Sequence, residues 1–147
     1  MVGHTVENFK LPDQNGQNFD LYENLDKNIL LIFYPKDNSR VCTRQLDSYQ
    51  KNIELFENKN IRIIGINIDN LDSHKNFCEE IGIGFPLLVD ENKDISRLFG
   101  ALNFLGMNKR KVILIGTDKK ILYEENVSYL NYPTSEDLLR KFEFLNI

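Results

Sequence analysis

The sequence predicts an α/β domain whose mixed central β-sheet is flanked by helices and preceded by an N-terminal hairpin. Short apolar runs of strand length alternate along the chain with segments whose apolar residues recur every three or four positions, as in amphipathic helices. The 147 residues are 41% hydrophobic and 27% charged, which is the balance of one globular domain with a sizeable core. No repeat or Gly/Ser/Pro-rich linker divides the chain, so we expect residues 1–147 to form a single domain.

The first half of the chain alternates between predicted strands and a predicted helix. The turn signal Asp-Gln-Asn-Gly at 13–16 predicts a small hairpin within residues 7–21. The apolar run 29–34 predicts a buried strand that stops at Pro35, because proline cannot donate a hydrogen bond to a sheet. From Arg44 to about Glu57 the apolar residues recur at helical spacing, which predicts an amphipathic helix.

The second half predicts further strands and helices in the same alternation. They are a strand at 61–68, a helix ended by Gly82 and Gly84, a strand at 86–89, a short helix at 95–99, a hairpin of strands 111–115 and 120–123, and a C-terminal helix capped by Thr134 or Ser135. The helix before Gly82 starts with residues of low helix propensity at 70–73, so we expect it to be weakly held. The order of the elements fits a thioredoxin-like fold.

Composition argues against several classes of function. The chain has 18 basic and 22 acidic residues, and a net charge of −4 argues against binding to nucleic-acid phosphates. The longest apolar stretch, 29–34, is far shorter than the roughly 20 residues that cross a bilayer, and residues 1–20 show no signal-peptide pattern. We therefore expect a soluble, cytoplasmic protein without nucleic-acid or membrane partners, present as a monomer or a weak dimer.

The two cysteines are the candidate reactive groups, since a chain of this size needs no structural disulfide in a reducing compartment. Cys42 is expected where the loop after a buried strand enters a helix, near free backbone N–H groups and the positive end of the helix dipole. Arg40 and Arg44 flank Cys42 and would add positive charge. Because such surroundings favour a thiolate, Cys42 is a candidate nucleophile; the alternative is an inert buried cysteine.

Three other residues have both a functional and a purely structural interpretation. Ser39 could donate a hydrogen bond to a bound oxygen atom, although its position alone is more typical of a loop or N-cap serine. Arg110 could reach the same pocket if its strand lies beside 29–34, although its basic neighbours favour a solvated arginine. Cys78 is expected at the edge of a helix's buried stripe.

His74 precedes Cys78 by four positions, but no second ligand pair with zinc-site spacing follows, and GxGxxG and P-loop patterns are absent.

The segment Phe33-Tyr34-Pro35-Lys36-Asp37, followed by Ser39 and Cys42-Thr43, resembles the active-site loop of the peroxiredoxins. Further matches follow the order seen in the Q-type, or bacterioferritin comigratory protein, subfamily and extend from about residue 3 to the C-terminus. They are Asn8-Phe9, Gly16, residues 65–69, His74, Phe77, residues 85–90, and Arg110 leading residues 112–115. The resemblance implies a thioredoxin-like fold and a thiol peroxidase that requires no metal, flavin or haem cofactor.

The resemblance also implies a role for each residue of the motif. Cys42 matches the peroxidatic cysteine, Ser39 the hydroxyl that contacts the peroxide, Pro35 the residue that shields the pocket, and Arg110 the arginine that stabilises the thiolate. Gln45 matches a Glu or Gln position in the same helix turn. Two departures stand out, since Ser39 replaces the commoner threonine and Arg40-Val41 replaces a common Pro-Gly.

The resolving cysteine is implied by the resemblance in the same way. Many Q-type members carry it five residues after the peroxidatic cysteine, a position that Asp47 occupies here, whereas others carry it on the next helix, where Cys78 lies. The implied cycle oxidises Cys42 to a sulfenic acid, which condenses with Cys78 to an intramolecular disulfide that thioredoxin or a similar dithiol reduces. If Cys78 does not resolve Cys42, the enzyme is a one-cysteine peroxidase with an external resolving thiol.

Two other functions remain open for a domain of this fold. A thiol-disulfide oxidoreductase would be expected to show a Cys-x-x-Cys pair, but Gln45 stands at the second cysteine's position. A non-catalytic thioredoxin-like binding module would not need the combination of proline, hydroxyl, cysteine and arginine that this chain retains. Peroxide consumption with a thiol reductant would separate both from a peroxidase.

Overall fold

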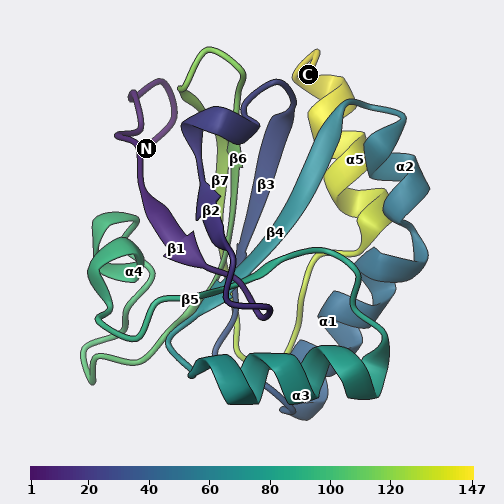
Figure 1. Cartoon of the computed structure of the whole chain (residues 1–147). Helices are drawn as coiled ribbons and strands as arrows, with labels where there is room; N and C mark the ends of the chain where they lie inside the picture. Colours follow the sequence, from purple (N-terminus) through teal and green to yellow (C-terminus); the bar gives the residue numbers. More distant parts are fainter.

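A five-stranded mixed β-sheet forms the centre of the computed structural model, which describes all of residues 1–147 (Figure 1). The strand order is β5-β4-β3-β6-β7, and a separate two-stranded hairpin pairs β1 with β2, so the predicted α/β architecture is confirmed. The strands are β1 (Lys10–Pro12), β2 (Asn18–Asp20), β3 (Asn28–Phe33), β4 (Ile61–Asn67), β5 (Leu87–Val89), β6 (Arg110–Ile115) and β7 (Ile121–Val127). The helices are α1 (Arg40–Lys51), α2 (Ile53–Glu57), α3 (Leu71–Ile81), α4 (Asp94–Leu98) and α5 (Ser135–Phe144), with a 3-10 turn at Tyr22–Asn24.

The central strand β3 determines which loops meet. It pairs in parallel with β4 and antiparallel with β6, so the carboxyl end of β3 lies beside the amino end of β6. In this register Phe33 pairs with Lys111, and Arg110 therefore begins β6 next to the loop that leaves β3 for α1. The strand pairing that Arg110 needs in order to reach the loop before Cys42 is thus present.

The two faces of the sheet are covered by different elements. Figure 1 shows α1, α2 and α5 on one side of the sheet and the hairpin β1–β2 with α4 on the other. Because successive strand residues point to opposite faces, Leu30 and Ile32 of β3 belong to the core beneath α1 and α5, whereas Leu31 and Phe33 belong to the core beneath the hairpin. Helix α3 follows β4 and crosses the end of the sheet (Figure 1). None of the helices has the length and apolar character of a membrane span.

The helix predicted over residues 44–57 differs from the observed structure in two ways. It starts earlier, at Arg40, because Ser39 caps it. It is also interrupted at Asn52, which separates α1 from α2. At Asn52 the backbone leaves the helical conformation, with φ −106° and ψ 20°, and the Ser48 carbonyl accepts both from the Asn52 side-chain amide at 2.9 Å and from its backbone N–H at 3.2 Å.

Helix α3 is held more firmly than its propensity suggests. Asn70 caps it by accepting from the Ser73 N–H at 2.9 Å, and Gly82 ends it in the left-handed conformation at a φ of 72°. The Ser73 hydroxyl and the His74 ring also bond to Asp37, in the loop before α1, at 2.7 and 2.6 Å. The expectation that low propensity leaves this helix weakly held does not hold for its first turn, where tertiary hydrogen bonds to Asp37 outweigh local propensity.

Candidate functional site

Cys42 is the third residue of α1, and its side chain is completely buried. The backbone N–H of Cys42 donates to the Ser39 Oγ at 3.2 Å, which closes the N-terminal cap of the helix. The sulfur is thereby held in the first helical turn, at the end of α1 that carries the partial positive charge of the helix dipole. The thiol is free, as is that of Cys78.

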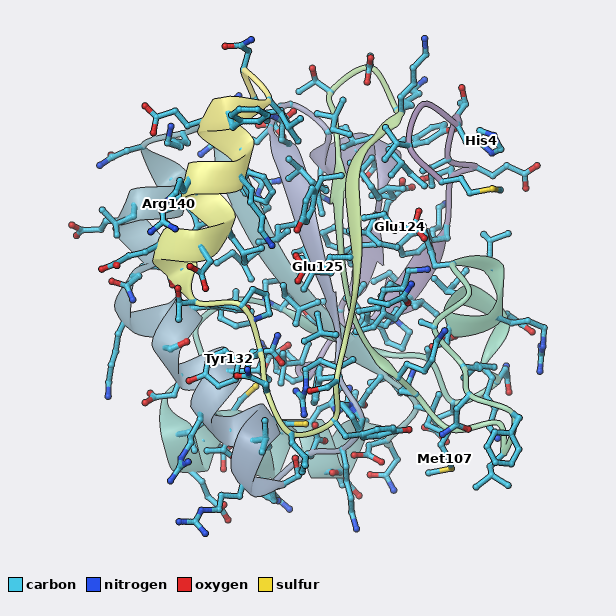
Figure 2. All side chains as sticks on the ribbon, turned by 180° about the vertical axis from the view of Figure 1, so that it is seen from behind. His4, Met107, Glu124, Glu125, Tyr132 and Arg140 are labelled. Carbon is cyan, nitrogen blue, oxygen red and sulfur yellow. The ribbon has the colours of Figure 1, made fainter.

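Arg110 contacts this sulfur from the neighbouring strand. Its Nη2 donates to Cys42 Sγ at 3.4 Å, and its Nη1 donates to Gln45 Oε1 at 2.6 Å. Two backbone carbonyls accept its remaining bonds, Ser128 from Nε at 3.2 Å and Tyr129 from Nη2 at 3.1 Å. Both carbonyls belong to the segment that leads from β7 to α5. Figure 2 shows this segment passing α1 at the labelled Tyr132.

Arg110 is a buried cation without a carboxylate partner. It is 1% exposed, and none of the protein's ion pairs includes it. A buried charge is costly unless an opposite charge compensates it, and the Cys42 sulfur is the one acceptor around Arg110 that can ionise. Arg110 therefore directs an uncompensated positive charge at the Cys42 sulfur. The interpretation of Arg110 as a solvated surface residue, which its sequence neighbours favoured, is wrong.

The other predicted residues of the loop occupy distinct places. Ser39 is half-buried and uses an oxygen lone pair in the cap, while its O–H proton has no acceptor within the protein. Pro35 is half-buried in the same loop. Arg40 and Arg44 are exposed, and neither hydrogen-bonds to the Cys42 sulfur. The positive charge expected from these two residues is therefore supplied at contact distance by Arg110 alone.

Cys78 lies on the inner face of α3 and is 8% exposed. It belongs to the same apolar cluster as Cys42, and it also lines a shallow surface hollow of about 250 Å³. Burial, together with the nearby charges of Asp37, Asp13 and Glu79, raises the pKa of the Cys78 thiol to about 12. Cys78 is therefore a neutral thiol in the folded protein at neutral pH.

A buried hydrogen-bond cluster around Asp37 joins the loop before α1 to α3. Asp37 accepts from the Tyr34 hydroxyl at 2.6 Å, from the Ser73 hydroxyl at 2.7 Å and from His74 Nδ1 at 2.6 Å. The other ring nitrogen of His74 lies 2.8 Å from the carbonyl oxygen of Leu88. Burial alone would raise the pKa of Asp37, but hydrogen bonds from His74, Tyr34 and Ser73 and the charge of His74 hold it below its ordinary value.

Sequence reasoning assigned no role to this cluster. Asp37 stood in the sequence only as part of the peroxiredoxin resemblance, His74 was considered besides that only for metal-ligand spacing with Cys78, and 37 positions separate the two residues. The available signal was an acidic residue directly after a buried strand together with a histidine at the start of a helix. No group of three or more His, Cys, Asp or Glu side chains is placed to hold a metal ion.

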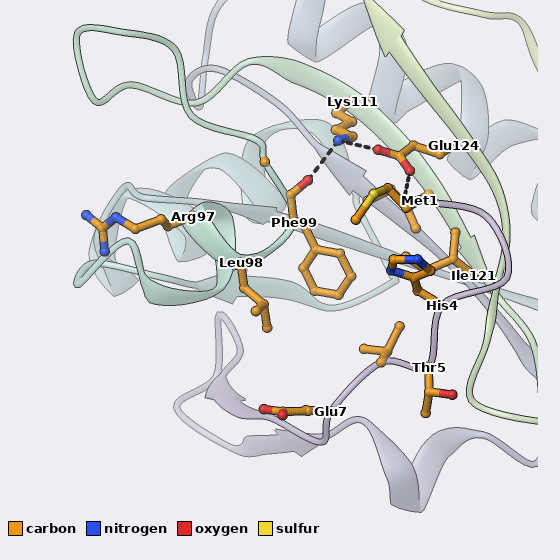
Figure 3. A pocket seen from close by; sticks show the side chains of 13 residues that line it. Met1, His4, Thr5, Glu7, Arg97, Leu98, Phe99, Lys111, Ile121 and Glu124 are labelled. Carbon is orange, nitrogen blue, oxygen red and sulfur yellow. Dashed lines mark hydrogen bonds and ion pairs between the residues drawn. The ribbon is translucent and has the colours of Figure 1, made fainter.

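A cavity of about 480 Å³ lies apart from both cysteines. Lys111 and Phe99 line it on the face of the sheet opposite α1. Figure 3 shows the Lys111 ammonium between the Phe99 carbonyl, at 2.8 Å, and the Glu124 carboxylate, at 2.6 Å. This buried cation is already paired with a carboxylate, whereas Arg110 at the Cys42 site is not.

Comparisons with known proteins identify the family of the chain. Residues 2–124 match the model of the AhpC/TSA family. A Helicobacter pylori (strain J99) protein named as the peroxiredoxin bcp is 34% identical over 100 residues, covering 68% of this chain and 66% of the relative. A chloroplastic peroxiredoxin Q of Gentiana triflora is 35% identical over 98 residues, covering 67% of this chain and 45% of the relative. The matched region thus spans less than two thirds of the length of these curated relatives.

A solved structure extends the likeness to nearly the whole chain. The crystal structure of the peroxidoxin BcpB from Mycobacterium tuberculosis superposes with a TM-score of 0.85 at 26% identity. The superposition covers 99% of this chain and 96% of BcpB. The predicted thioredoxin-like fold and the predicted resemblance to bcp and Q-type peroxiredoxins are both confirmed.

Proposed function

The chain belongs to the AhpC/TSA family, and we propose that it is a thiol peroxidase that reduces hydrogen peroxide and organic hydroperoxides with Cys42 as the peroxidatic cysteine. The observation that carries the proposal is the contact at 3.4 Å between the Cys42 sulfur and the buried, carboxylate-free guanidinium of Arg110. A cation in contact with a cysteine at a helix N-terminus maintains a thiolate, which is the nucleophile that peroxide cleavage requires.

In the first step, the Cys42 thiolate attacks the terminal oxygen of the peroxide. A sulfur–oxygen bond forms as the O–O bond breaks, which yields Cys42 sulfenic acid and a hydroxide or alkoxide that leaves as water or alcohol after taking up a proton. Negative charge moves from sulfur to the leaving oxygen during this step. Arg110 stabilises that charge because its guanidinium stays beside the reacting atoms without an anion of its own.

Two residues of the loop assist at the same place. The Ser39 O–H donates to a peroxide oxygen, because its proton is not used by the helix cap. Pro35 shields the reacting atoms and offers no N–H that would compete for the peroxide. Since the Cys42 side chain is completely buried, peroxide enters when the residues that cover it move aside.

In the second step, Cys78 resolves the sulfenic acid. The Cys78 sulfur attacks the Cys42 sulfur, a disulfide forms, and the sulfenic oxygen leaves as water with the thiol proton. The raised pKa of the Cys78 thiol, about 12, means that it must move into a more polar environment before it reacts quickly. Local unwinding of α1 or α3 provides this change and brings the sulfurs together.

Thioredoxin or a similar dithiol then reduces the disulfide by thiol–disulfide exchange and returns both cysteines to the thiol state. This cycle uses no metal, flavin or haem, since sulfur alone carries the redox change. A reducing cytoplasm supplies such a dithiol, and there the protein acts as a monomer or a weak dimer.

Peroxide consumption with a thioredoxin system tests the proposal. Cys42→Ser should abolish turnover and keep the fold, because serine supplies no thiolate at neutral pH. Cys78→Ser should still form one sulfenic acid per chain in a single turnover, which makes it the matched control. Full turnover by the Cys42→Ser protein would exclude Cys42 as the peroxidatic residue.

The burial of Cys78 favours one alternative, a one-cysteine peroxidase with an external resolving thiol. Peptide mapping after one equivalent of peroxide separates the two mechanisms. A Cys42–Cys78 crosslink within one chain supports internal resolution. A lasting sulfenic acid on Cys42 with Cys78 free, or a disulfide between two chains, makes Cys78 a structural residue.

A further inference from the structure

We propose that Tyr49 is a positioning residue for the reaction of Cys42. Its hydroxyl orients the side-chain amide of Gln45 so that the amide oxygen faces Arg110 and holds the guanidinium against the sulfur. The inference rests on the proposed function, in which that guanidinium stabilises the thiolate and the leaving oxygen.

The direction of each hydrogen bond in this chain follows from the chemistry of its ends. The Pro133 carbonyl can only accept, so the Tyr49 hydroxyl donates its single proton to it, at 2.6 Å. The Tyr49 oxygen is then left as an acceptor, and it lies 3.2 Å from Gln45 Nε2. With Nε2 committed to Tyr49, Gln45 Oε1 is turned toward Arg110 Nη1, at 2.6 Å.

Arg110 tolerates only one orientation of the amide. A guanidinium has N–H donors and no acceptor, so a flipped amide would place its NH₂ group against Nη1, donor facing donor. The flip would break the shortest of the hydrogen bonds that Arg110 makes. Because the amide itself is symmetric in shape, packing cannot select between the two orientations, and the Tyr49 hydroxyl selects from one end the orientation that Arg110 requires at the other.

The geometry of helix α1 supports this chain of hydrogen bonds. Cys42, Gln45 and Tyr49 are three and four positions apart along α1, so they lie on one face of the helix, and all three are completely buried. The Tyr49 ring is held edge-on by Phe56, at 6.0 Å between centroids, and by Tyr132, at 6.3 Å. The hydroxyl is therefore fixed in place before it orients Gln45.

Packing requires only the ring of Tyr49. The helical periodicity of the sequence places this residue among the apolar positions of α1, where phenylalanine would fill the same space. The hydroxyl adds two hydrogen bonds in the core, one of which leads to the reactive sulfur through Gln45 and Arg110. Tyr49→Phe is consequently a nearly isosteric change that removes the orienting group alone.

The test measures the reactivity of Cys42 in a Cys78→Ser background, where it is the only thiol. We expect Tyr49→Phe to slow both iodoacetamide alkylation at neutral pH and oxidation by hydrogen peroxide by about three- to tenfold, the effect of one hydrogen bond. Tyr22→Phe is the matched control, because its hydroxyl also donates to a carbonyl, that of Val6 at 2.5 Å, on the opposite face of the sheet. The control should change neither rate.

A double-mutant cycle shows whether Tyr49 acts through Gln45. Gln45→Met keeps the shape of the side chain without the amide, so adding Tyr49→Phe to it should slow neither reaction further. Unchanged rates in the single Tyr49→Phe protein, or an undiminished Tyr49→Phe effect in the Gln45→Met background, would overturn the inference. If the parent protein consumes no peroxide while the alkylation rates follow the expected pattern, the proposed function fails and the positioning role stands.

Discussion

Replacing Arg110 by methionine tests the charge arrangement of the site directly. The substitution removes the cation that contacts the Cys42 sulfur and leaves an unbranched apolar side chain in the core. Because Arg110 has no carboxylate partner, its removal strands no buried anion other than a Cys42 thiolate. We therefore expect a large change in thiol chemistry without loss of the fold.

The structure gives the size of the effect. Two unit charges separated by the 3.4 Å between Nη2 and Sγ attract with about 1 kcal/mol at a dielectric constant of about 80 and about 5 kcal/mol at about 20. Each ~1.4 kcal/mol corresponds to a factor of about 10. Arg110→Met should therefore slow alkylation of Cys42 at neutral pH, and its oxidation by peroxide, by roughly 5- to 4000-fold.

The assay follows both rates in the Cys78→Ser background, together with the ultraviolet absorbance of the thiolate. Arg62→Met is a matched control, because Arg62 also donates to a backbone carbonyl, that of Asn24 at 3.2 Å, but does so away from the cysteines. Arg62→Met should leave the thiol rates unchanged. Equal rates in the Arg110→Met protein and its parent would refute the idea that this guanidinium maintains the thiolate.

Cys42 and Arg110 should also be coupled in their effects on the free energy of unfolding. Cys42→Ser removes the ionisable partner of Arg110 and leaves a buried cation among neutral acceptors, so it should lower the free energy of unfolding. Adding Arg110→Met to Cys42→Ser should recover part of that loss, because the uncompensated charge is then gone. Additive effects of the two substitutions on urea unfolding would contradict charge coupling between these residues.

The remaining predictions concern the groups around the sulfur. Gln45→Glu gives Arg110 a carboxylate that competes with the thiolate, so alkylation at neutral pH should slow about threefold or more; an unchanged rate would argue against competition. Asp37, whose pKa is held below its ordinary 3.8, stabilises the fold above that pH and loses this contribution as the pH falls through the lowered value. Urea unfolding from pH about 5 to about 2.5 should therefore show a smaller loss of stability for Asp37→Asn than for the parent. Ser39→Ala should cost about 1 kcal/mol of stability and slow peroxide oxidation, whereas Ser39→Thr should preserve both. An internal Cys42–Cys78 disulfide should lower the helical circular dichroism signal, and an unaltered spectrum would exclude unwinding.

The features predicted correctly from the sequence are those that local patterns encode. The turn at 13–16, the apolar strand 29–34 and the capping residue Thr134 each depend on neighbours within a few positions. The start of α1 was predicted too late in the sequence, because no local apolar pattern marks it. Residues 40–44 carry little apolar periodicity, so the helical signal began only where the buried stripe begins, although the Ser39 cap extends the helix back to Arg40.

The features that sequence reasoning missed depend on contacts between distant segments. The basic neighbours of Arg110 predict an exposed surface charge. In the structure Arg110 is buried, because β6 pairs with β3 beside the loop that precedes Cys42. Likewise, the bond between Asp37 and His74 exists because β4 returns the chain to that loop. Only the family resemblance placed Arg110 at the thiol, since local propensity contains no information about such pairings.

In the proposed cycle Cys78 has to reach Cys42, and the same distant contacts determine which end of α3 opens at the lower cost. Unwinding α3 from its first turn would break the hydrogen bonds of Ser73 and His74 to the Asp37 carboxylate, and bonds to charged groups are worth about 1.5–3 kcal/mol each. At the other end, the Cys78 carbonyl is capped by the N–H groups of Gly82 and Ile83, at 2.9 and 3.2 Å, and no charged side chain takes part. The C-terminal end of α3 is thus the less costly one to open. Resolution should therefore proceed by unwinding backward from Gly82, which frees Cys78 while Asp37 keeps the first turn of α3 attached to the loop that leads to Cys42.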